Sequence, residues 1–366
     1  MSQRIIIHID LDYFYAQCEE TANPSIRYKP VVVCVYSART EESGVVSTSN
    51  YEARKFGVRA GIPIVRAKKL LESTSAVFLP MNRPLYESVS QRIMALIQSY
   101  GDSFEKSGVD EAYLDISEGS RGNYDSAETI ASKLKQAILS EVHITCSIGI
   151  APNKLLAKIA SDYVKPDGLT VVKPKQVQDF LKGPVNRIPG VGTKIEERLK
   201  QLNVRTVDEL ARLNPIILNE VFGKSLGGYL FRAARGEDNE PVRDRILPTQ
   251  LSRISTLKRN TSDFRIIRPV LRDLTQSVVE SLKGKELSCK SVSIIGILSD
   301  LSIHTRSATL DSATTDSRLI IEVAERLMQQ FLESRSQANL RRVGVKLSGL
   351  SKLSGQTNIK AFFSTS

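Results

Sequence analysis

Acidic residues that could bind metal ions occur at two separated points in this sequence. Asp10 and Asp12 follow an apolar run in the stretch RIIIHIDLDYFYAQ, and Asp110 and Glu111 are adjacent in SGVDEAYLD. A carboxylate at the end of a buried strand is costly unless something pairs with it. Carboxylate oxygens suit Mg²⁺, which takes few protein ligands and shares its remaining coordination with substrate phosphates. Two such ions about 4 Å apart can activate an attacking hydroxyl and stabilise a leaving pyrophosphate. The pattern therefore indicates two metal ions and a nucleotide, although surface charge would also explain acidic residues at strand ends.

The two aspartates of the first cluster need not act alike. Residues two apart on a strand share a face, so Asp10 and Asp12 would point the same way within a strand. Where the strand ends the chain turns, and only one of the two side chains need point into the site.

An aromatic triplet follows the first cluster directly: Tyr13, Phe14 and Tyr15. A ring held beside the sugar of a nucleotide excludes a 2′-hydroxyl by its volume, so such a site can select deoxyribose without contacting the base. Ordinary aromatic packing is the alternative that the triplet alone leaves open.

Hydroxyl and cationic side chains occur where a triphosphate could bind. The stretch STSNYEARKFGVRAGIP contains Thr48, Tyr51 and Arg54, and the last two would share one face of a helix. A hydroxyl with a guanidinium suits phosphate oxygens, and Lys165 in VKPDG is a candidate second cation. Each of these residues alone could equally be a solvated surface residue. The phosphate-binding patterns GxxxxGKS, GxxxxGKT and GxGxxG do not occur in the sequence.

A glycine hairpin between helices predicts a phosphate-binding turn at residues 187–202, RIPGVGTKIEERLKQL. Gly190 and Gly192 let the backbone approach closely, and the amides that begin the next helix, near Lys194, can bind a DNA phosphate without base contact. A plain turn between helices remains the alternative.

Positive charge is concentrated in the C-terminal third. Residues 241–366 carry 20 Lys and Arg against 11 Asp and Glu, whereas residues 1–240 carry 31 against 29. Arg253, Lys258 and Arg259 lie in or beside a polar strand pattern that suits backbone phosphates. The distribution favours a domain that grips a polyanion, with a solubilising surface as the alternative.

The Ser-rich tail contains a short motif, QTNIKAFF. Its residues Gln356, Ile359, Phe362 and Phe363 would lie on one side of a helical turn. Exposed phenylalanines are costly unless a partner buries them, so the motif predicts a docking segment; a tail folded back onto the body is the alternative.

The composition limits the class of protein. A chain of 366 residues with 41% hydrophobic residues is long enough for two to four globular domains. No apolar run approaches the roughly 18 residues of a membrane span, and we expect no signal peptide. Widely spaced cysteines and only three histidines argue against a zinc site and predict free thiols in a reducing cytoplasm.

The hydrophobic periodicity predicts a mixed α/β arrangement in the first half, with a sheet built from strands distant in sequence. We expect short helices over residues 175–235, a linker at 237–250 and then a sheet with helices on one face. The expected strands are residues 4–10, 30–36, 109–117, 142–151, 251–259, 291–300 and 340–350. The expected helices are residues 50–57, 85–101 (ended by Gly101), 126–140, 153–168, 268–283 and 317–334.

Taken together and in order, these motifs resemble the Y-family, or translesion, DNA polymerases of the archaeal DNA polymerase IV type. The segments that carry the resemblance are IDLDYFYAQ, NYEARKFGVRAGIP, VDEAYLDIS, GIAPNKLLAKIASDYVKPDG, IPGVG and LKRN. The resemblance implies an α+β multidomain fold, a right-hand polymerase with an added little-finger domain. The implied domains are a palm of mixed sheet and helices (1–13 and 79–172), small fingers (14–78), a helical thumb with a helix-hairpin-helix (173–238), a linker (239–250), a little finger of β-sheet with two helices (251–350) and a flexible tail (351–366).

The resemblance also implies a role for each candidate residue. Asp10, Asp110 and Glu111, with the Leu11 backbone carbonyl, would hold two Mg²⁺ ions, whereas Asp12 occupies a position that is not usually a ligand. Tyr15 would be the steric gate against ribonucleotides. The triphosphate would be held by Tyr13, Phe14, Thr48, Tyr51, Arg54 and Lys165, and DNA by Gly190, Gly192, Lys194, Arg253, Lys258 and Arg259. Gln356, Ile359, Phe362 and Phe363 would bind a ring-shaped sliding clamp.

The implied activity is template-directed addition of deoxynucleotides to a primer 3′ end, with low fidelity, bypass of damaged bases and no proofreading. The expected partners are primer-template DNA, deoxynucleoside triphosphates and the clamp, and the expected state is a cytoplasmic monomer that does not bind membranes. A non-catalytic DNA-binding accessory protein would not need the acidic trio, and a metal-dependent nuclease would not need a sugar gate.

Overall fold

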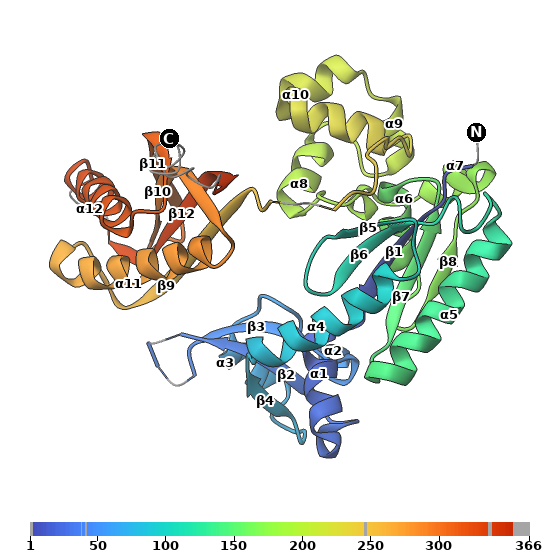
Figure 1. Ribbon diagram of the computed structural model, residues 1–366, viewed down its shortest axis with the longest axis horizontal. Helices are drawn as coiled ribbons and strands as arrows, with labels where there is room; N and C mark the ends of the chain where they lie inside the picture. Colours follow the sequence, from blue (N-terminus) through green and yellow to red (C-terminus); the bar gives the residue numbers. More distant parts are fainter. Residues whose placement is uncertain (1–2, 38, 41, 245–246, 336–338, 354–366) are drawn as a thin grey trace, which may run out of the picture. The chain divides into compact units, whose positions relative to one another are not determined.

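The computed structural model describes residues 3–37, 39–40, 42–244, 247–335 and 339–353 (Figure 1). The chain divides into two compact units, residues 1–35 with 45–244 and residues 36–44 with 245–366. No helix in the described ranges is long and apolar enough to span a membrane.

The larger sheet of the first unit has the strand order β5-β6-β1-β7-β8. Strand β1 lies between β6 and β7 and pairs antiparallel with both, whereas β7 and β8 are parallel. A central strand is buried on both faces, which explains why the β1 sequence IIHIDL is almost wholly buried. The strands are β1 (Ile6–Leu11), β5 (Ser103–Lys106), β6 (Glu111–Asp115), β7 (Cys146–Ala151) and β8 (Leu169–Val171).

Alternation along β1 directs its side chains to different layers. Ile7 and Ile9 enter one core with the apolar faces of α4 (Arg83–Gln98) and α5 (Tyr124–Val142). The intervening His8 and Asp10 face the layer that holds α6 (Lys154–Tyr163) and the turn after it. The polar residues of β1 are therefore gathered under a single helix.

A smaller sheet, β3-β2-β4, follows β1 in the chain. Its β2 strand pairs parallel with β4, and a core around Val32, Val46 and Ile64 joins the sheet to its short helices. The elements are α1 (Phe14–Ala22), η1 (Pro24–Ile26), β2 (Val31–Tyr36), β3 (Gly44–Ser49), α2 (Tyr51–Lys55), α3 (Ile64–Leu70) and β4 (Val77–Pro80).

Residues 174–233 form short helices, as the sequence predicts. The longest helix of this segment, α10 (Pro215–Ala233), is interrupted at Gly223, whose φ of 79° lies outside the helical region. The Tyr229 hydroxyl donates to the Pro189 carbonyl at 2.6 Å and ties that helix to the glycine hairpin. The elements are η2 (Pro174–Gln176), α7 (Val177–Leu181), η3 (Val185–Arg187), α8 (Thr193–Gln201), α9 (Val207–Arg212) and α10 (Pro215–Ala233).

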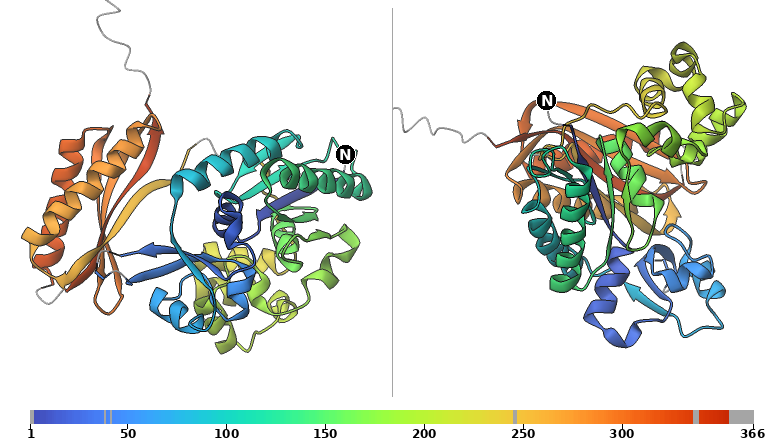
Figure 2. Two further views of the ribbon diagram at one scale, coloured as in Figure 1. Left: turned by 90° about the horizontal axis from the view of Figure 1, so that it is seen from below. Right: turned by 90° about the vertical axis from the view of Figure 1, so that its right-hand side faces the viewer.

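The second unit is an antiparallel sheet of order β11-β10-β12-β9 with helices α11 and α12 side by side on one face (Figure 2). Leu271, Val279 and Phe331 of the helices are buried against Val292 and Val345 of the sheet. The elements are β9 (Gln250–Thr261), α11 (Phe264–Lys283), β10 (Leu287–Leu298), β11 (Ile303–Thr314), α12 (Ser317–Glu333) and β12 (Leu340–Lys352).

Three local expectations were wrong. The helix expected over 153–168 ends at Tyr163, and the strand expected from 142 begins at Cys146 because α5 extends to Val142. Gly101 does not cap α4, which ends at Gln98; a Cβ on Gly101 would lie 2.5 Å from Leu114 Cδ2, so that glycine permits close packing instead.

The edge strand β11 was not predicted. Its sequence IHTRSATLDSAT is mostly polar and mostly exposed, as expected for an edge strand with one solvated face. The apolar signal of a strand is weak in such a segment, and its pairing with β10 supplies what the sequence does not show.

Candidate active site

Pairing of β1 with β6 brings the two acidic clusters together. Asp10 lies directly opposite Glu111 in the antiparallel register, and the Leu11 amide donates to the Asp110 carbonyl at 2.9 Å. Asp10, Asp110 and Glu111 therefore meet at one end of the larger sheet, although a hundred residues separate the clusters.

Burial disfavours the charged form of two carboxylates in this group, Asp10 and Asp110. Burial raises the pKa of Asp10 to about 6 in spite of the nearby Lys165, and the charge of Glu111 adds to the rise. Burial also raises the pKa of Asp110, again with a contribution from Glu111. Anions that are partly desolvated and repel one another are typical of a cation site.

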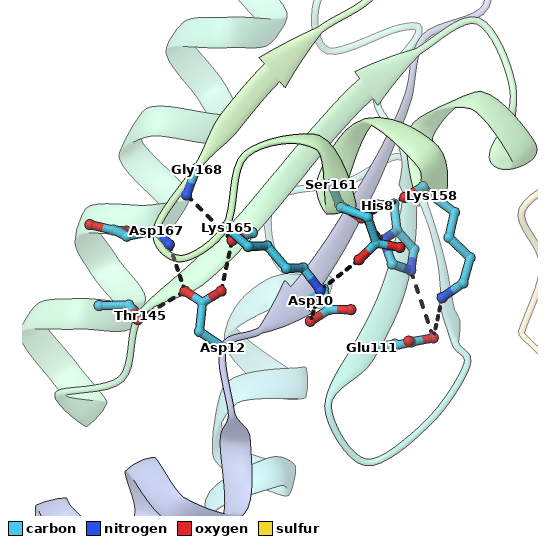
Figure 3. Close-up of polar contacts among 12 residues, drawn as sticks. His8, Asp10, Asp12, Glu111, Thr145, Lys158, Ser161, Lys165, Asp167 and Gly168 are labelled. Atoms are coloured by element: carbon cyan, nitrogen blue, oxygen red, sulfur yellow. Dashed lines mark hydrogen bonds and ion pairs between the residues drawn. The ribbon is translucent and has the colours of Figure 1, made fainter. Parts of the chain in front are cut away.

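Glu111 is held by residues that face it from β1 and α6 (Figure 3). Lys158 Nζ donates to Glu111 Oε2 at 2.8 Å, and His8 Nε2 lies 3.8 Å from the same oxygen. The contacts with His8 and Lys158 lower the pKa of Glu111 to about 2. The His8 distance is too long for a normal hydrogen bond, so Lys158 is the stronger partner. Ser161 Oγ fixes the imidazole at 2.7 Å from Nδ1, and burial lowers the pKa of His8.

Lys165 pairs with Asp10 as Lys158 pairs with Glu111. Its ammonium lies 2.8 Å from Asp10 Oδ1 and 2.7 Å from Asp162 Oδ1. Burial opposes the charged form, but these two carboxylates raise the pKa of Lys165 above its usual value. Sequence reasoning found Lys165 and missed Lys158 and His8; the spacing of Lys158 and Lys165 in one helix-to-turn segment was the available signal.

The donor set fits a hard divalent cation. Within the described ranges, no three His, Cys, Asp or Glu side chains are close enough together to hold a metal ion. In this structure the carboxylates of Asp10 and Glu111 are instead paired with the ammonium groups of Lys165 and Lys158. Oxygen donors that meet in register and repel one another are suited to Mg²⁺.

The aromatic triplet divides between the core and the site. Phe14 is 2% exposed and packs in the core, whereas the Tyr15 ring stacks on Tyr86 at 4.5 Å between centroids. Burial raises the pKa of Tyr15, with a further contribution from the charge of Asp110. Tyr13 precedes α1 in a left-handed conformation, and no side chain in the described residues caps that helix. The first amides of α1 therefore remain suited to an anion.

Tyr51 and Arg54 are brought together as their spacing predicts. The Arg54 guanidinium lies 4.7 Å from the centroid of the Tyr51 ring, and Tyr13 packs edge-on against the same ring at 5.3 Å. Arg54 Nε donates to the Ser49 carbonyl at 3.0 Å, which orients the guanidinium. Thr48 lies on the neighbouring strand β3 and is half-buried.

The glycine hairpin leads into α8 as expected. Gly190 has a φ of 86°, which favours glycine, and Gly192 is the residue before α8, with open space where a Cβ would be. Lys194 is exposed in the first turn, and α8 has no side-chain cap among the described residues.

In the second unit, Arg253, Lys258 and Arg259 are exposed along β9. Arg253 Nη2 donates to Ser281 Oγ at 3.3 Å. The proposed clamp-binding residues Gln356, Ile359, Phe362 and Phe363 lie outside the described residues.

Comparisons with known proteins cover nearly the whole chain. A family model described as the impB/mucB/samB family matches residues 9–162, its C-terminal domain matches 248–359, and a model described as the DNA polymerase-iota thumb domain matches 186–238. The chain is 42% identical over 365 residues to DNA polymerase IV of Nitrosopumilus maritimus, covering 99% of this chain and 100% of that one. It is 38% identical over 360 residues to DNA polymerase IV of Saccharolobus solfataricus, covering 98% and 99%.

Solved structures agree with the sequence comparisons. A Y-family DNA polymerase chimera of Dbh and Dpo4 superposes with a TM-score of 0.89 at 38% identity, covering 95% of this chain and 99% of that one. An insertion ternary complex of Dbh DNA polymerase superposes with a TM-score of 0.68 at 39% identity, covering 94% and 98%.

Proposed function

Because this chain belongs to the Y family of DNA polymerases and is a translesion-type DNA-directed DNA polymerase, we propose that Asp10, Asp110 and Glu111 form the centre at which it extends a primer. The observation that carries this assignment is the register of β1 and β6, which sets Asp10 opposite Glu111. Relatives named DNA polymerase IV align over almost the full chain, so a non-catalytic accessory role is not favoured.

The acidic trio and the Leu11 carbonyl would hold two Mg²⁺ ions. When bound, these ions would activate the primer 3′-hydroxyl and neutralise charge on the triphosphate. Lys158 and Lys165 form ion pairs with the carboxylates of Glu111 and Asp10. With a cation held by Asp10, the Lys165 ammonium would be available to bind phosphate oxygens.

Tyr13, Phe14, Thr48, Tyr51, Arg54 and Lys165 form the proposed triphosphate site. The amides at the start of α1, at Tyr13 and Phe14, supply donors without a net charge, and the contact of Arg54 with Tyr51 presets the guanidinium. Positioning of this kind, together with charge neutralisation, accounts for most of the catalysis in phosphoryl transfer.

Tyr15 is the proposed steric gate. Its ring is fixed by stacking on Tyr86, so it cannot easily turn away from a ribose 2′-hydroxyl. The rigidity of the ring supports selection by volume.

Primer-template DNA and deoxynucleoside triphosphates are the proposed substrates, in keeping with the ternary complexes among the structural relatives. Gly190, Gly192 and Lys194 would bind DNA phosphates from the hairpin, and Arg253, Lys258 and Arg259 from β9. The tail residues would bind a sliding clamp. The cysteines are free and buried, which suits a monomer in a reducing cytoplasm.

Primer extension with Mg²⁺ tests the proposal. We expect Glu111→Ala to abolish extension on undamaged and abasic templates while primer-template binding persists, and Tyr15→Ala to admit ribonucleotides. Glu118→Ala, an exposed carboxylate variant on the loop after β6, is the matched control. Extension by Glu111→Ala at the control rate would contradict the assignment.

A further inference from the structure

Asp12 is a buried carboxylate that the proposed chemistry does not use. It is 1% exposed, and it accepts hydrogen bonds from side chains and backbone (Figure 3). Ser147 Oγ donates to Asp12 Oδ1 at 2.7 Å, while Thr145 Oγ1 and the Asp167 amide donate to Oδ2 at 2.9 and 2.8 Å. A charge buried at this depth is tolerated because such donors replace water.

Asp12 and Asp10 point to different partners. Asp10 contacts the Lys165 ammonium, whereas Asp12 contacts the start of β7 and the backbone amide of Asp167. The two aspartates therefore hold the side chain and the backbone of a single turn, residues 165–168.

The turn is fixed by further contacts with the body of the first unit. Lys135 on α5 donates to Asp167 Oδ1 at 2.6 Å and to the Gly168 carbonyl at 3.2 Å. The Gly168 amide donates to Ser147 Oγ at 3.3 Å. A Cβ on Gly168 would lie 1.8 Å from the Val164 carbonyl oxygen, so the turn is also tightly packed.

The conformation of the turn needs this support. Asp167 has a φ of 56°, in the left-handed region, which aspartate adopts more readily than most residues but less readily than the right-handed regions. Asp12 accepts a hydrogen bond from the backbone amide of Asp167, which lies two positions after Lys165. Loss of the acceptor would leave the partly buried Asp167 amide without this partner and would release the turn toward more favourable backbone angles.

We propose that Asp12 is a positioning residue that fixes the turn at 165–168 and thereby places the Lys165 ammonium for the triphosphate of the incoming nucleotide. This inference rests on the proposed role of Lys165. It assigns the second aspartate of the Asp-x-Asp motif to nucleotide binding by way of the turn, and not to metal binding.

A double-mutant cycle in the full-length protein tests this inference. Single-nucleotide insertion with Mg²⁺ would give KM for the nucleotide and kcat for wild type, Asp12→Ala, Asp12→Asn, Lys165→Ala and both double variants. We expect Asp12→Ala to raise KM by about tenfold, since hydrogen bonds to a charged group are being lost. Asn keeps an acceptor oxygen, although a weaker one, so Asp12→Asn should raise KM only about threefold. Asp125→Ala removes a carboxylate that is exposed and paired with Lys173, and it should leave both constants unchanged.

The decisive result is the coupling between the two positions. In the Lys165→Ala background, adding Asp12→Ala should raise KM no further, because the cation that the turn positions is already gone. A merely structural role of Asp12 would lower the melting temperature and kcat without this coupling. Fluorescence anisotropy should show unchanged primer-template affinity in each single variant.

The failures can be distinguished. If Lys165→Ala leaves KM unchanged, the proposed role of Lys165 is wrong and the inference falls with it. If Lys165→Ala raises KM but the effects of Asp12→Ala and Lys165→Ala on KM multiply in the double variant, the inference about Asp12 alone is wrong. Should Asp12→Ala fail to fold, the cycle with Asp12→Asn carries the same test: its threefold effect must disappear in the Lys165→Ala background.

Discussion

Gly149 on β7 allows α6 to lie directly on the larger sheet. Its replacement by alanine should displace α6 and, with it, the lysines that contact the candidate active site. A Cβ at this position would lie 2.1 Å from the Ala157 carbonyl oxygen and 2.4 Å from the Ser161 amide nitrogen. Both atoms belong to the backbone of α6, so no side chain can move aside. An ordinary contact needs about 3.4 Å, and the helix must therefore retreat by roughly 1 Å.

The expected cost has two parts. Overpacking of a tight interface lowers the free energy of unfolding by about 1–3 kcal/mol. In a unit of this size, each kcal/mol lowers the melting temperature by about 2–4 °C. Helix α6 also carries Lys158 and leads to Lys165, which contact Glu111 and Asp10. A displacement of about 1 Å in catalytic positioning costs on the order of 100-fold in rate, so kcat/KM for nucleotide insertion should fall by about that factor.

Single-nucleotide insertion and thermal unfolding measure the two parts separately. Gly119→Ala is the matched control, because its added methyl would meet only the Asp102 Oδ1 atom, at 3.4 Å, within the described residues. If Gly149→Ala melts lower but keeps the kcat/KM of the control, the coupling of α6 packing to catalysis is refuted. If Gly149→Ala has both the kcat/KM and the melting temperature of the control, the packing argument is wrong as well.

Three further predictions concern charge. Lys154 and Glu105 form an ion pair of 2.7 Å with side chains 9% and 2% exposed, so Lys154→Met should cost about 3–5 kcal/mol in urea unfolding and Lys154→Met with Glu105→Leu much less; a loss below about 1 kcal/mol in the single variant would contradict this. Partial burial favours the neutral form of Glu325, but its ion pairs with Arg268 and Arg272 outweigh this effect and lower the pKa of the carboxyl. The stabilising effect of the charged form is therefore present above the unfolded pKa near 4.5 and is lost as the pH falls. Glu325→Gln should therefore be slightly less stable than wild type at pH 7, by up to about 1 kcal/mol, and as stable as wild type at pH 3; the same loss of stability at both pH values would refute the ion-pair explanation. Chelation of divalent cations should stop primer extension but not primer-template binding, and added Mg²⁺ should restore it; extension that persists in chelator would exclude the proposed metal role.

Residue types and spacing indicated several components of the candidate site, although not Lys158 or His8. Hard carboxylates at strand ends, an aromatic triplet beside them and the pairing of Tyr51 with Arg54 are local patterns, and the last is confirmed by a contact within one helix. The helices of the second unit were also predictable, since their amphipathic periodicity is strong and each begins after an aspartate cap. The polar edge strand β11 lacked such a signal.

Long-range pairing decided what the sequence left open. Asp10 and Asp12 look equivalent in the motif, yet the end of β1 separates them: Asp10 meets Glu111 across the sheet and Asp12 meets the backbone of the turn after α6. Neither partner is near in sequence, so no local propensity could assign them. The sequence by itself determined which chemistry the chain could perform, because side-chain type sets ligand hardness, charge and size. The tertiary structure alone decided which carboxylate lies opposite Glu111 and which accepts hydrogen bonds from the turn after α6, because strand register and helix packing bring together residues from distant parts of the chain.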